Sequence, residues 1–324
     1  MTAQLTCREA IAQAIADELE SDPDVILFGE DVGAAGGVFK STVGLFERFG
    51  SERVRDTPIS EQAIVGAAIG AAIMGLRPIA ELMFADFAGV AFDQLANQLA
   101  KLRYLTGGQA KLPVTVRLAN GAGAGFAAQH SQSTENWFLN VPGLKIVVPG
   151  TVEDCYGLLR AAVRDDNPVL VFEHKNLLGL KGTIPTTSFN LGEAAVVRAG
   201  RDVTVVATQQ MRHRALEAAE GLALEGIELE VIDPRTLVPF DDETVADSLA
   251  RTARLLVVQE GPPAGGWGAS LIARMTQEHF DCFDVPPRLL ASPETPIPYA
   301  GRLEEAWLVS CQDVMGAAHE LVEA

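Results

Sequence analysis

The stretch TPISEQ, residues 57–62, decides the fold together with the small-residue run AIVGAAIGAAIMG that follows it at 63–75. Pro58 fixes its own φ and disfavours the helical conformation in the residue before it, so an extended approach is predicted. Ser60 is then placed to cap a helix, because its hydroxyl oxygen can accept a backbone N–H of the first turn. Glu61 would project from that turn, at a strand-to-helix junction where α/β proteins bind ligands.

The helix predicted behind Glu61 is unusually rich in small residues, among them Gly66 and Gly70. Each glycine costs about 1 kcal/mol of helix propensity relative to alanine, so this composition predicts close backbone packing against another element. Glu61 also has a simpler interpretation, since an acid in the first turn complements the helix dipole. On this stretch alone the simpler interpretation is favoured, because an isolated acid is weak evidence of function.

Length and composition narrow the class of protein. The 324 residues suffice for two domains with separate cores, and 43 acidic against 25 basic residues give a net charge of −18. This balance argues against a nucleic-acid surface and favours a basic protein partner. No apolar run approaches the roughly 18–20 residues of a membrane span, and residues 1–10 lack the pattern of a secretory signal. The four cysteines are far apart without metal-ligand spacing, which predicts thiols in a reducing cytoplasm.

The order of segments predicts an α/β protein with two parallel-sheet domains. Strands are expected at 25–28, 78–84, 113–118, 144–148, 169–172, 203–207, 227–232 and 255–258. Helices are expected at 6–19, 42–49, 88–104, 151–163, 212–224 and 267–277. Strands separated by helices imply parallel sheets with right-handed crossovers. Periodicity is lost between 175 and 191, which we interpret as the linker between the two domains.

Three side chains outside the central stretch are candidates for chemistry. Glu30 follows the first strand, and acids at the carboxyl end of a strand face the ligand crevice of an open sheet. Phe87 follows the second strand and can stack on a planar ring, although an aromatic there is more often part of a core. His130 comes after a glycine-rich loop, and a histidine titrates near neutral pH, but most loop histidines have no catalytic role.

Taken together, these segments resemble the β subunit of the thiamine-diphosphate-dependent 2-oxo acid dehydrogenases. That subunit belongs to the decarboxylating component of the pyruvate, branched-chain and acetoin dehydrogenase complexes. The motifs that carry the resemblance are FGEDV (28–32), GVF (37–39), DTPISE (56–61), FADF (84–87), QHSQS (129–133), PGLK (142–145) and RDDNP (164–168). The resemblance covers essentially the full chain and implies a transketolase-like pyrimidine-binding domain at 1–185 and a transketolase-like C-terminal domain at 186–324.

The resemblance implies a role for each matched side chain. Glu61 is similar to the glutamate that hydrogen-bonds the ring nitrogen of the cofactor's aminopyrimidine and so favours its imino tautomer. Phe87 looks like the aromatic residue that packs on the pyrimidine, Ile59 like its backbone and apolar neighbour, and Glu30 like the strand-end acid of the same pocket. His130 matches the histidine that faces the substrate and assists proton or acyl transfer to the lipoyl group.

The resemblance also implies metals and partners. A monovalent-cation site, with K⁺ as its ion and mainly backbone ligands, is expected at Leu112, Val114, Thr115, Ala162, Asp165 and Asn167. No Gly-Asp-Gly followed by a distant Asn is found, and the family places this motif, which holds Mg²⁺ and the diphosphate, in the α subunit. The chain therefore resembles half of a site in an α₂β₂ assembly that works on a small 2-oxo acid or acetoin and docks to a lipoyl acyltransferase core.

Two other functions stay open at this stage. One is a transketolase-like or deoxyxylulose-synthase-like half that passes no acyl group to lipoamide. The other is a non-catalytic assembly subunit, against which the retention of both Glu61 and His130 argues. The segment GFAAQ at 125–129 is more similar to the pyruvate and acetoin types than to the branched-chain type.

Overall fold

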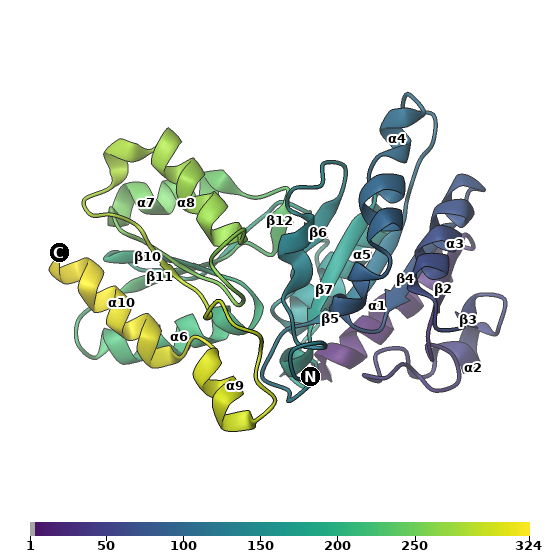
Figure 1. Ribbon diagram of the computed structural model, residues 1–324, viewed down its shortest axis with the longest axis horizontal. Coiled ribbons are helices and arrows are strands. Elements are labelled where there is room, and N and C mark those ends of the chain that lie inside the picture. The colour runs from purple at the N-terminus through teal and green to yellow at the C-terminus, as the bar shows by residue number, and fades with distance from the viewer. Residues whose placement is uncertain (1–3) are drawn as a thin grey trace. The chain divides into compact units, whose positions relative to one another are not determined.

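The computed structural model describes residues 4–324, so the first three residues of the segment searched for a secretory signal lie outside it. The chain forms two compact units (Figure 1). The residues up to Gly121 and Trp137–Leu191 make up the first unit, and Ala122–Asn136 and Gly192–Ala324 the second. His130 is thus carried by the second unit, whereas Glu61 belongs to the first. The predicted functional division at 185/186 stays a prediction.

A parallel sheet forms the centre of the first unit, with its strands in the order β6-β7-β5-β4-β2-β3. The strands are β2 (Val25–Gly29), β3 (Val54–Asp56), β4 (Arg77–Leu82), β5 (Thr115–Asn120), β6 (Lys145–Val147) and β7 (Val169–His174). All residues of β2, β5 and β7 are buried, as expected for strands covered on both faces. A short antiparallel pair, β1 (Leu5–Thr6) and β8 (Lys181–Gly182), lies outside this sheet.

The helices of the first unit are α1 (Cys7–Ser21), α2 (Leu45–Phe49), α3 (Glu61–Ile73), α4 (Leu102–Leu105) and α5 (Val152–Arg164). A capping box starts α1, as predicted: Thr6 N donates to Glu9 Oε2 at 2.7 Å, and Glu9 N donates to Thr6 Oγ1 at 3.4 Å. Figure 1 shows α1 and α5 side by side, and their apolar faces share one core with β2 and β7.

Two local predictions are wrong. The segment 88–104 does not form one α-helix: a 3₁₀ turn at Ala85–Gly89 is followed by a π-helical segment at Gln94–Leu99 and only then by α4. Apolar periodicity does not distinguish an α-helix from a π-helix here, since either hydrogen-bonding pattern buries Leu95 and Leu99. Ser60 also fails to cap α3 with its hydroxyl, because it adopts φ −164° and ψ 82° and makes no such hydrogen bond.

The second unit contains a sheet with the strand order β14-β13-β10-β11-β9. The helices and strands of the second unit are β9 (Ala195–Arg198), β10 (Val203–Ala207), α6 (Gln209–Ala223), β11 (Leu229–Asp233), β12 (Thr236–Val238), α7 (Asp242–Thr252), β13 (Leu255–Val258), α8 (Trp267–Glu278), β14 (Arg288–Leu290), α9 (Gly301–Trp307) and α10 (Cys311–Glu323). Of these strands, β12 is not part of the five-stranded sheet. Figure 1 shows α7 and α8 on one face of the sheet and α6 and α10 on the other. The predicted parallel pairing holds for the neighbours β14, β13, β10 and β11, but β9 pairs antiparallel with β11 at the edge.

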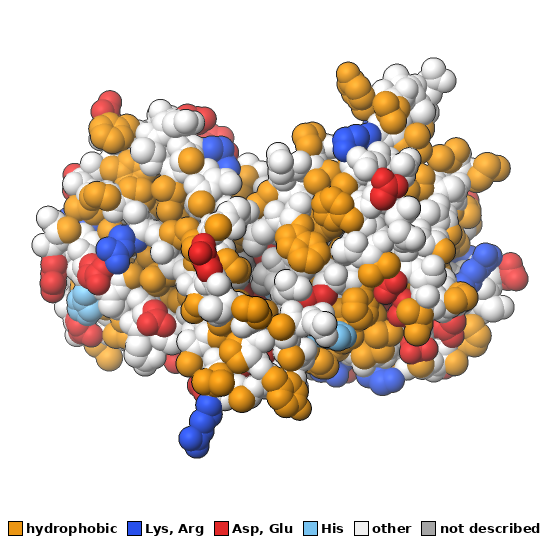
Figure 2. Space-filling view, viewed as in Figure 1, with side chains coloured by type: hydrophobic (Ala, Val, Ile, Leu, Met, Phe, Trp, Pro, Cys, Tyr) orange, Lys and Arg blue, Asp and Glu red, His pale blue; other side chains and the backbone are white. Residues whose placement is uncertain are grey.

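The surface has no single dominant acidic patch on the face shown in Figure 2, where acidic side chains are scattered among basic and apolar ones. Apolar side chains gather at the outer end of α4, where Tyr104 is 87% and Leu105 70% exposed. Within the described part of the chain, no helix combines the length and the apolar character that a membrane crossing requires.

Gly143 tests the packing of the π-helical segment. It adopts φ +108°, and an added Cβ would lie 1.9 Å from the carbonyl oxygen of Ala100. Backbone strain and overpacking add, so Gly143→Ala should lower the free energy of unfolding by about 2–5 kcal/mol, measured by urea denaturation. The matched control is Gly66→Ala in α3, where nothing lies within 4 Å and a gain of up to about 1 kcal/mol is expected. Equal denaturation midpoints for the two variants would contradict this account.

Candidate active site

Two acids lie at the carboxyl ends of neighbouring parallel strands. Glu30 follows β2, and Glu61 opens α3 five residues after Asp56, the last residue of β3. Gly29 of β2 pairs with Asp56 of β3. Thr57 N donates to Gly29 O at 2.9 Å, which holds the connection to α3 against β2. Both carboxyl groups are buried, with Glu30 6% and Glu61 7% exposed. The sheet topology therefore brings together two acids that the sequence separates.

Burial and like charge act on this pair. Burial raises the pKa of Glu30, and the negative charge of Glu61 raises it further, with smaller contributions from Asp31 and Glu81. Oε1 of Glu30 and Oγ1 of Thr57 are both buried and have no hydrogen-bond partner among the described residues. The site thus holds a carboxyl group that keeps its proton more readily than usual, and two polar oxygens with unused hydrogen-bonding capacity.

Aromatic side chains lie at the end of the adjacent strand β4. Phe87 is half-buried, and its ring meets that of Phe84 edge-on, with centroids 5.5 Å apart and an interplanar angle of 73°. Phe84 makes a second edge contact with Phe39 at 5.4 Å and 82°. Ile59, in contrast, is 83% exposed. Phe87 is therefore held by a packed aromatic cluster, whereas the Ile59 side chain has no cover within the chain.

A buried charged cluster was missed by the sequence analysis. Arg117 in β5 is 1% exposed and donates through Nε and Nη2 to the two carboxylate oxygens of Glu173, both at 2.7 Å. Its Nη1 donates to Glu81 in β4, and its Nη2 also donates to Ser41 Oγ at 3.0 Å. Burial raises the pKa of Glu81, although the guanidinium of Arg117 opposes the shift.

This cluster joins the sheet to the glycine-rich loop that follows Glu30. Ser41 fixes the far end of the loop, Thr42 Oγ1 donates to Val32 O at 2.9 Å, and Gly33 N donates to Asp56 Oδ1 at 2.6 Å. A signal for the cluster was present in the sequence. Each of the apolar runs 79–84, 114–119 and 169–173 contains one charged residue, and such a residue in a buried strand requires a partner.

His130 lies in the segment Ala122–Asn136 of the second unit. It is half-buried, and its backbone N–H donates to Ala127 O at 3.4 Å. The structure brings Glu30 and Glu61 together and places Phe87 after β4, the other neighbour of β2, all in the first unit. His130 belongs to the second unit.

The residues predicted for a monovalent cation gather around the amino-terminal ends of β5 and β7. Leu112 N donates to Asp166 O at 3.2 Å, and Val169 N donates to Val114 O at 2.9 Å. Thr115 Oγ1 is buried and has no hydrogen-bond partner among the described residues. The site is therefore rich in carbonyl and hydroxyl oxygens, which are the ligands that hard cations prefer.

Asp165, the acidic residue of the predicted cation site, is already paired. Lys145 Nζ donates to the Asp165 carboxylate, and Asn167 N donates to its Oδ1 at 2.8 Å. Burial alone would raise the pKa of Asp165, but the hydrogen bonds from Lys145 and Asn167 outweigh it and hold this pKa below its usual value. Asp165 N also donates to Ala162 O at 3.2 Å, which closes the end of α5 over the site.

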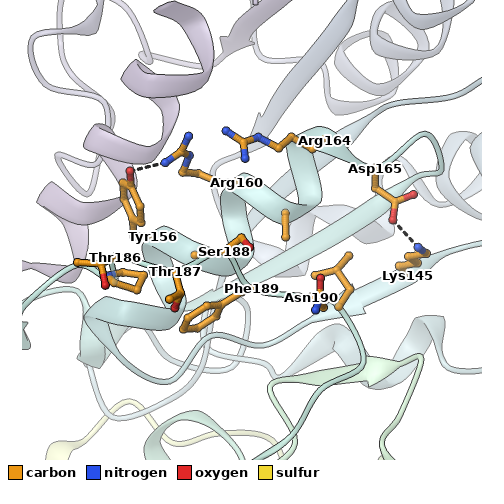
Figure 3. Close-up of a pocket in the computed structure, with 14 residues that line it drawn as sticks. Lys145, Tyr156, Arg160, Arg164, Asp165, Thr186, Thr187, Ser188, Phe189 and Asn190 are labelled. Atoms are coloured by element: carbon orange, nitrogen blue, oxygen red, sulfur yellow. Dashed lines mark hydrogen bonds and ion pairs between the residues drawn. The ribbon is translucent and has the colours of Figure 1, made fainter. Parts of the chain in front are cut away.

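A cavity of about 540 Å³ lies elsewhere in the first unit, between α5, Lys145 and the segment 185–191 (Figure 3). Its charged groups are already paired: Arg160 bonds Tyr156 and Glu18, and Lys145 bonds Asp165. None of the predicted catalytic or cofactor-binding residues lines it. This cavity is therefore distinct from the candidate active site.

Comparison with known proteins decides the family. Residues 3–181 match the family model "Transketolase, pyrimidine binding domain", and residues 192–314 match "Transketolase, C-terminal domain". The acetoin:2,6-dichlorophenolindophenol oxidoreductase subunit beta of Cupriavidus necator is 46% identical over 100% of this chain and 99% of that protein. The 2-oxoisovalerate dehydrogenase subunit beta of Bacillus subtilis is 46% identical over 97% of this chain and 98% of its own. The chain belongs to this family of transketolase-like dehydrogenase β subunits.

Other members of the dehydrogenase β-subunit family are similar over the whole chain. The chloroplastic pyruvate dehydrogenase E1 component subunit beta-3 of Arabidopsis thaliana is 41% identical over 99% of this chain and 79% of that protein. A solved structure, "Split gene transketolase, inactive beta4 tetramer", superposes with a TM-score of 0.83 at 24% identity, covering 98% of this chain and 99% of its own. Membership confirms the predicted α/β fold and the predicted kind of enzyme subunit. The roles of individual residues stay predictions.

The raised pKa of Glu30 predicts a pH dependence of stability. Burial and the charge of Glu61 make the folded chain hold the Glu30 proton more tightly than the unfolded chain does. The resulting stability is fully present below the ordinary carboxyl pKa of 4.5 and is lost as the pH rises through the raised value. Relative to wild type, Glu30→Gln should therefore gain stability as the pH rises above about 5, measured by urea denaturation. Glu52→Gln, whose side chain is 92% exposed, is the matched control, and parallel profiles for wild type and Glu30→Gln would disprove the assignment.

Proposed function

We propose that the chain is the β subunit of a thiamine-diphosphate-dependent dehydrogenase component that decarboxylates a 2-oxo acid or cleaves acetoin. The acyl group would pass to lipoyl groups of an acyltransferase core. The observation that carries the proposal is the buried pair Glu30 and Glu61 at the strand ends, with an unpartnered oxygen on Glu30. The named relatives support it, since one acts on acetoin and another is a 2-oxoisovalerate dehydrogenase subunit.

The residues at the strand ends fit the pyrimidine end of this cofactor. Glu61 would hold a proton at the ring nitrogen of the aminopyrimidine, and the orphaned oxygens of Glu30 and Thr57 supply further polar contacts. Phe87 offers a ring for packing, and the exposed Ile59 an apolar neighbour. When bound, thiamine diphosphate supplies a carbon nucleophile for attack on the substrate carbonyl.

Proton transfer at the pyrimidine requires a carboxyl group that can hold or share a proton at neutral pH. Glu30 stores a proton beside Glu61, because burial and the charge of Glu61 raise the pKa of Glu30. The raised pKa lets Glu30 keep its proton to a higher pH than an ordinary carboxyl group, beside Glu61. In this proposal Glu61 and His130 are the catalytic residues of the chain, and His130 guides the proton needed for acyl transfer to the lipoyl group.

The diphosphate and Mg²⁺ would be held by a partner α subunit. The sequence has no Gly-Asp-Gly motif, and residues 4–324 contain no cluster of three His, Cys, Asp or Glu side chains able to hold a metal. The exposed side of α3 supports a partner: Cβ atoms added at Gly66 and Gly70 would meet nothing within 4 Å, and Ile73 and Met74 are 53% and 82% exposed. A small, apolar helix face of this kind suits close helix packing in an α₂β₂ assembly.

The second oxygen-rich site would hold a monovalent cation such as K⁺. The proposed ligands, largely backbone carbonyls, are Leu112, Val114, Thr115, Ala162, Asp165 and Asn167. The unpartnered hydroxyl of Thr115 supports an ion there. Lys145 on the Asp165 carboxylate and Arg77, whose Nη1 donates to Asp165 O at 3.3 Å, already offset the negative charge. A single positive charge therefore suits the site better than a double one.

The competing functions draw less support. A transketolase-like half draws on the fold likeness and on the names of the two matching domain families. The full-length relatives at 41–46% identity, in contrast, are named dehydrogenase or oxidoreductase subunits. A non-catalytic subunit would not need the buried pair. We also propose a cytoplasmic location, which the four free cysteines support, because thiols stay reduced there.

The half-site proposal predicts that the isolated chain binds thiamine diphosphate weakly or not at all. In this proposal the chain supplies polar contacts for the pyrimidine, and its sequence lacks the Gly-Asp-Gly motif that would hold the diphosphate and Mg²⁺. Calorimetric titration of the cofactor with Mg²⁺ should show binding only after the α subunit is added. Glu61→Ala in the assembled pair is the control for the pyrimidine contact. Micromolar, Mg²⁺-dependent binding to the isolated chain would refute the proposal.

Glu61 and His130 should act at different steps of the cycle. In the assembled pair, Glu61→Gln should slow exchange of the cofactor's thiazolium C2 proton by about 10²–10⁴-fold. His130→Ala should leave this exchange intact and slow acylation of a lipoyl domain by about 10²-fold. The exposed neighbours Gln62 and Gln129, changed to alanine, serve as matched controls. Wild-type exchange in Glu61→Gln, or wild-type acylation in His130→Ala, would remove the corresponding residue from the mechanism.

A further inference from the structure

We propose that Glu260 and Glu304 are positioning residues that fix the backbone of the loop 122–133 and thereby present His130. The inference rests on the proposed role of His130 and adds two residues of the second unit to the machinery. Neither residue belongs to the motifs that carry the family resemblance.

Two glycines give the loop unusual backbone freedom. Gly123 and Gly125 adopt φ +93° and +75°, and residues 123–126 are exposed. Glycine loses more conformational freedom on ordering than any other residue, so contacts from outside the loop must fix it. Ala127 also adopts φ +58°, three residues before His130, and a non-glycine residue keeps this conformation only where surrounding contacts impose it.

Glu304 in α9 holds the glycine part of the loop. Its side chain is buried, with the residue 3% exposed. Gly123 N donates to Oε1 at 2.7 Å, and Gly125 N donates to Oε2 at 3.0 Å. Two backbone donors thus converge on one carboxylate, and hydrogen bonds to an ionised acceptor are stronger than neutral ones. The carboxylate thereby sets the turn between the two glycines.

Glu260 joins the two ends of the loop. It follows β13 and is 7% exposed. Its Oε1 accepts Ala122 N at 2.6 Å and the hydroxyl of Ser133 at 3.2 Å. Because residues eleven positions apart bind one oxygen, the loop between them is closed at its base.

A third contact fixes the segment beyond His130. Asn136 Oδ1 accepts the N–H of Trp267, the first residue of α8, at 3.0 Å. His130 therefore lies between anchors at 125 and 133, each made to an element of the second unit. The contacts with Glu304 and the contact of Glu260 with Ala122 act on the loop backbone, and those of Ser133 and Asn136 hold the loop through its side chains. Together they govern where the imidazole is placed and take no part in the chemistry.

The test uses the assembled α/β pair and the variants Glu304→Gln and Glu304→Ala. We expect C2 proton exchange to stay at the wild-type rate, KM for the lipoyl domain to change little, and kcat for acylation to fall by about 10²-fold through misplacement of His130. Amide hydrogen exchange at residues 122–133 should accelerate, which is a readout independent of activity. Glu305→Gln, an exposed neighbour on α9, is the matched control.

A double mutant separates positioning from an independent effect. Adding Glu304→Gln to His130→Ala should cause no further loss of acylation, because Glu304 acts through the imidazole. If the double mutant loses acylation by the product of the two single-mutant losses, the inference is overturned. Wild-type acylation in Glu304→Gln, when His130→Ala is impaired, would overturn it too. If Glu304→Ala does not fold, Glu304→Gln and Ser133→Ala carry the test. Wild-type acylation in His130→Ala alone would instead remove His130 from the proposed mechanism, on which this inference rests.

Discussion

The buried guanidinium of Arg117 is the interaction on which the first unit depends. It lies between carboxylates from two other strands, Glu81 in β4 and Glu173 in β7, and it reaches Ser41 in the loop beyond Glu30. Removal of one partner from such a buried network costs about 3–5 kcal/mol, because an uncompensated charge is left behind. Since Glu81 and Arg117 are opposite each other in the ladder, the ion pair also fixes the register of the strands. The edge that carries the candidate site is thereby rigid.

The candidate site uses this rigidity to hold two acids in an unfavourable arrangement. Glu30 and Glu61 are both buried, and the charge of one raises the pKa of the other. Like-charge pairs of this kind lower stability unless the surrounding structure compensates, and they are typical of sites that move protons. The same end of the sheet is held by the aromatic contacts of Phe84 and by the hydrogen bond from Gly33 to Asp56.

Sequence alone was enough for features set by neighbouring residues. The capping box of Thr6 and Glu9 and the strand at Val25–Gly29 were predictable because local chemistry determines them. The π-helical turn at Gln94–Leu99 was not predictable, since an α-helix and a π-helix show the same apolar periodicity over so short a segment. The partners of Arg117 were signalled by isolated charges in apolar runs, but the contact of Glu260 with Ala122 spans 138 positions and leaves no local pattern. Such contacts follow from topology, which composition does not encode.

The segment Ala122–Asn136 packs with the second unit although it interrupts the first in the sequence. The two units are therefore interleaved along the gene, and no single cut separates them. A fragment that begins at residue 192 would retain the carboxylates of Glu260 and Glu304 but lose the backbone donors that they bind. Expression of the C-terminal portion by itself would thus yield a protein in which Glu260 and Glu304 lack these hydrogen-bond donors. An intact second unit requires residues 122–136 to be fused back or supplied in trans.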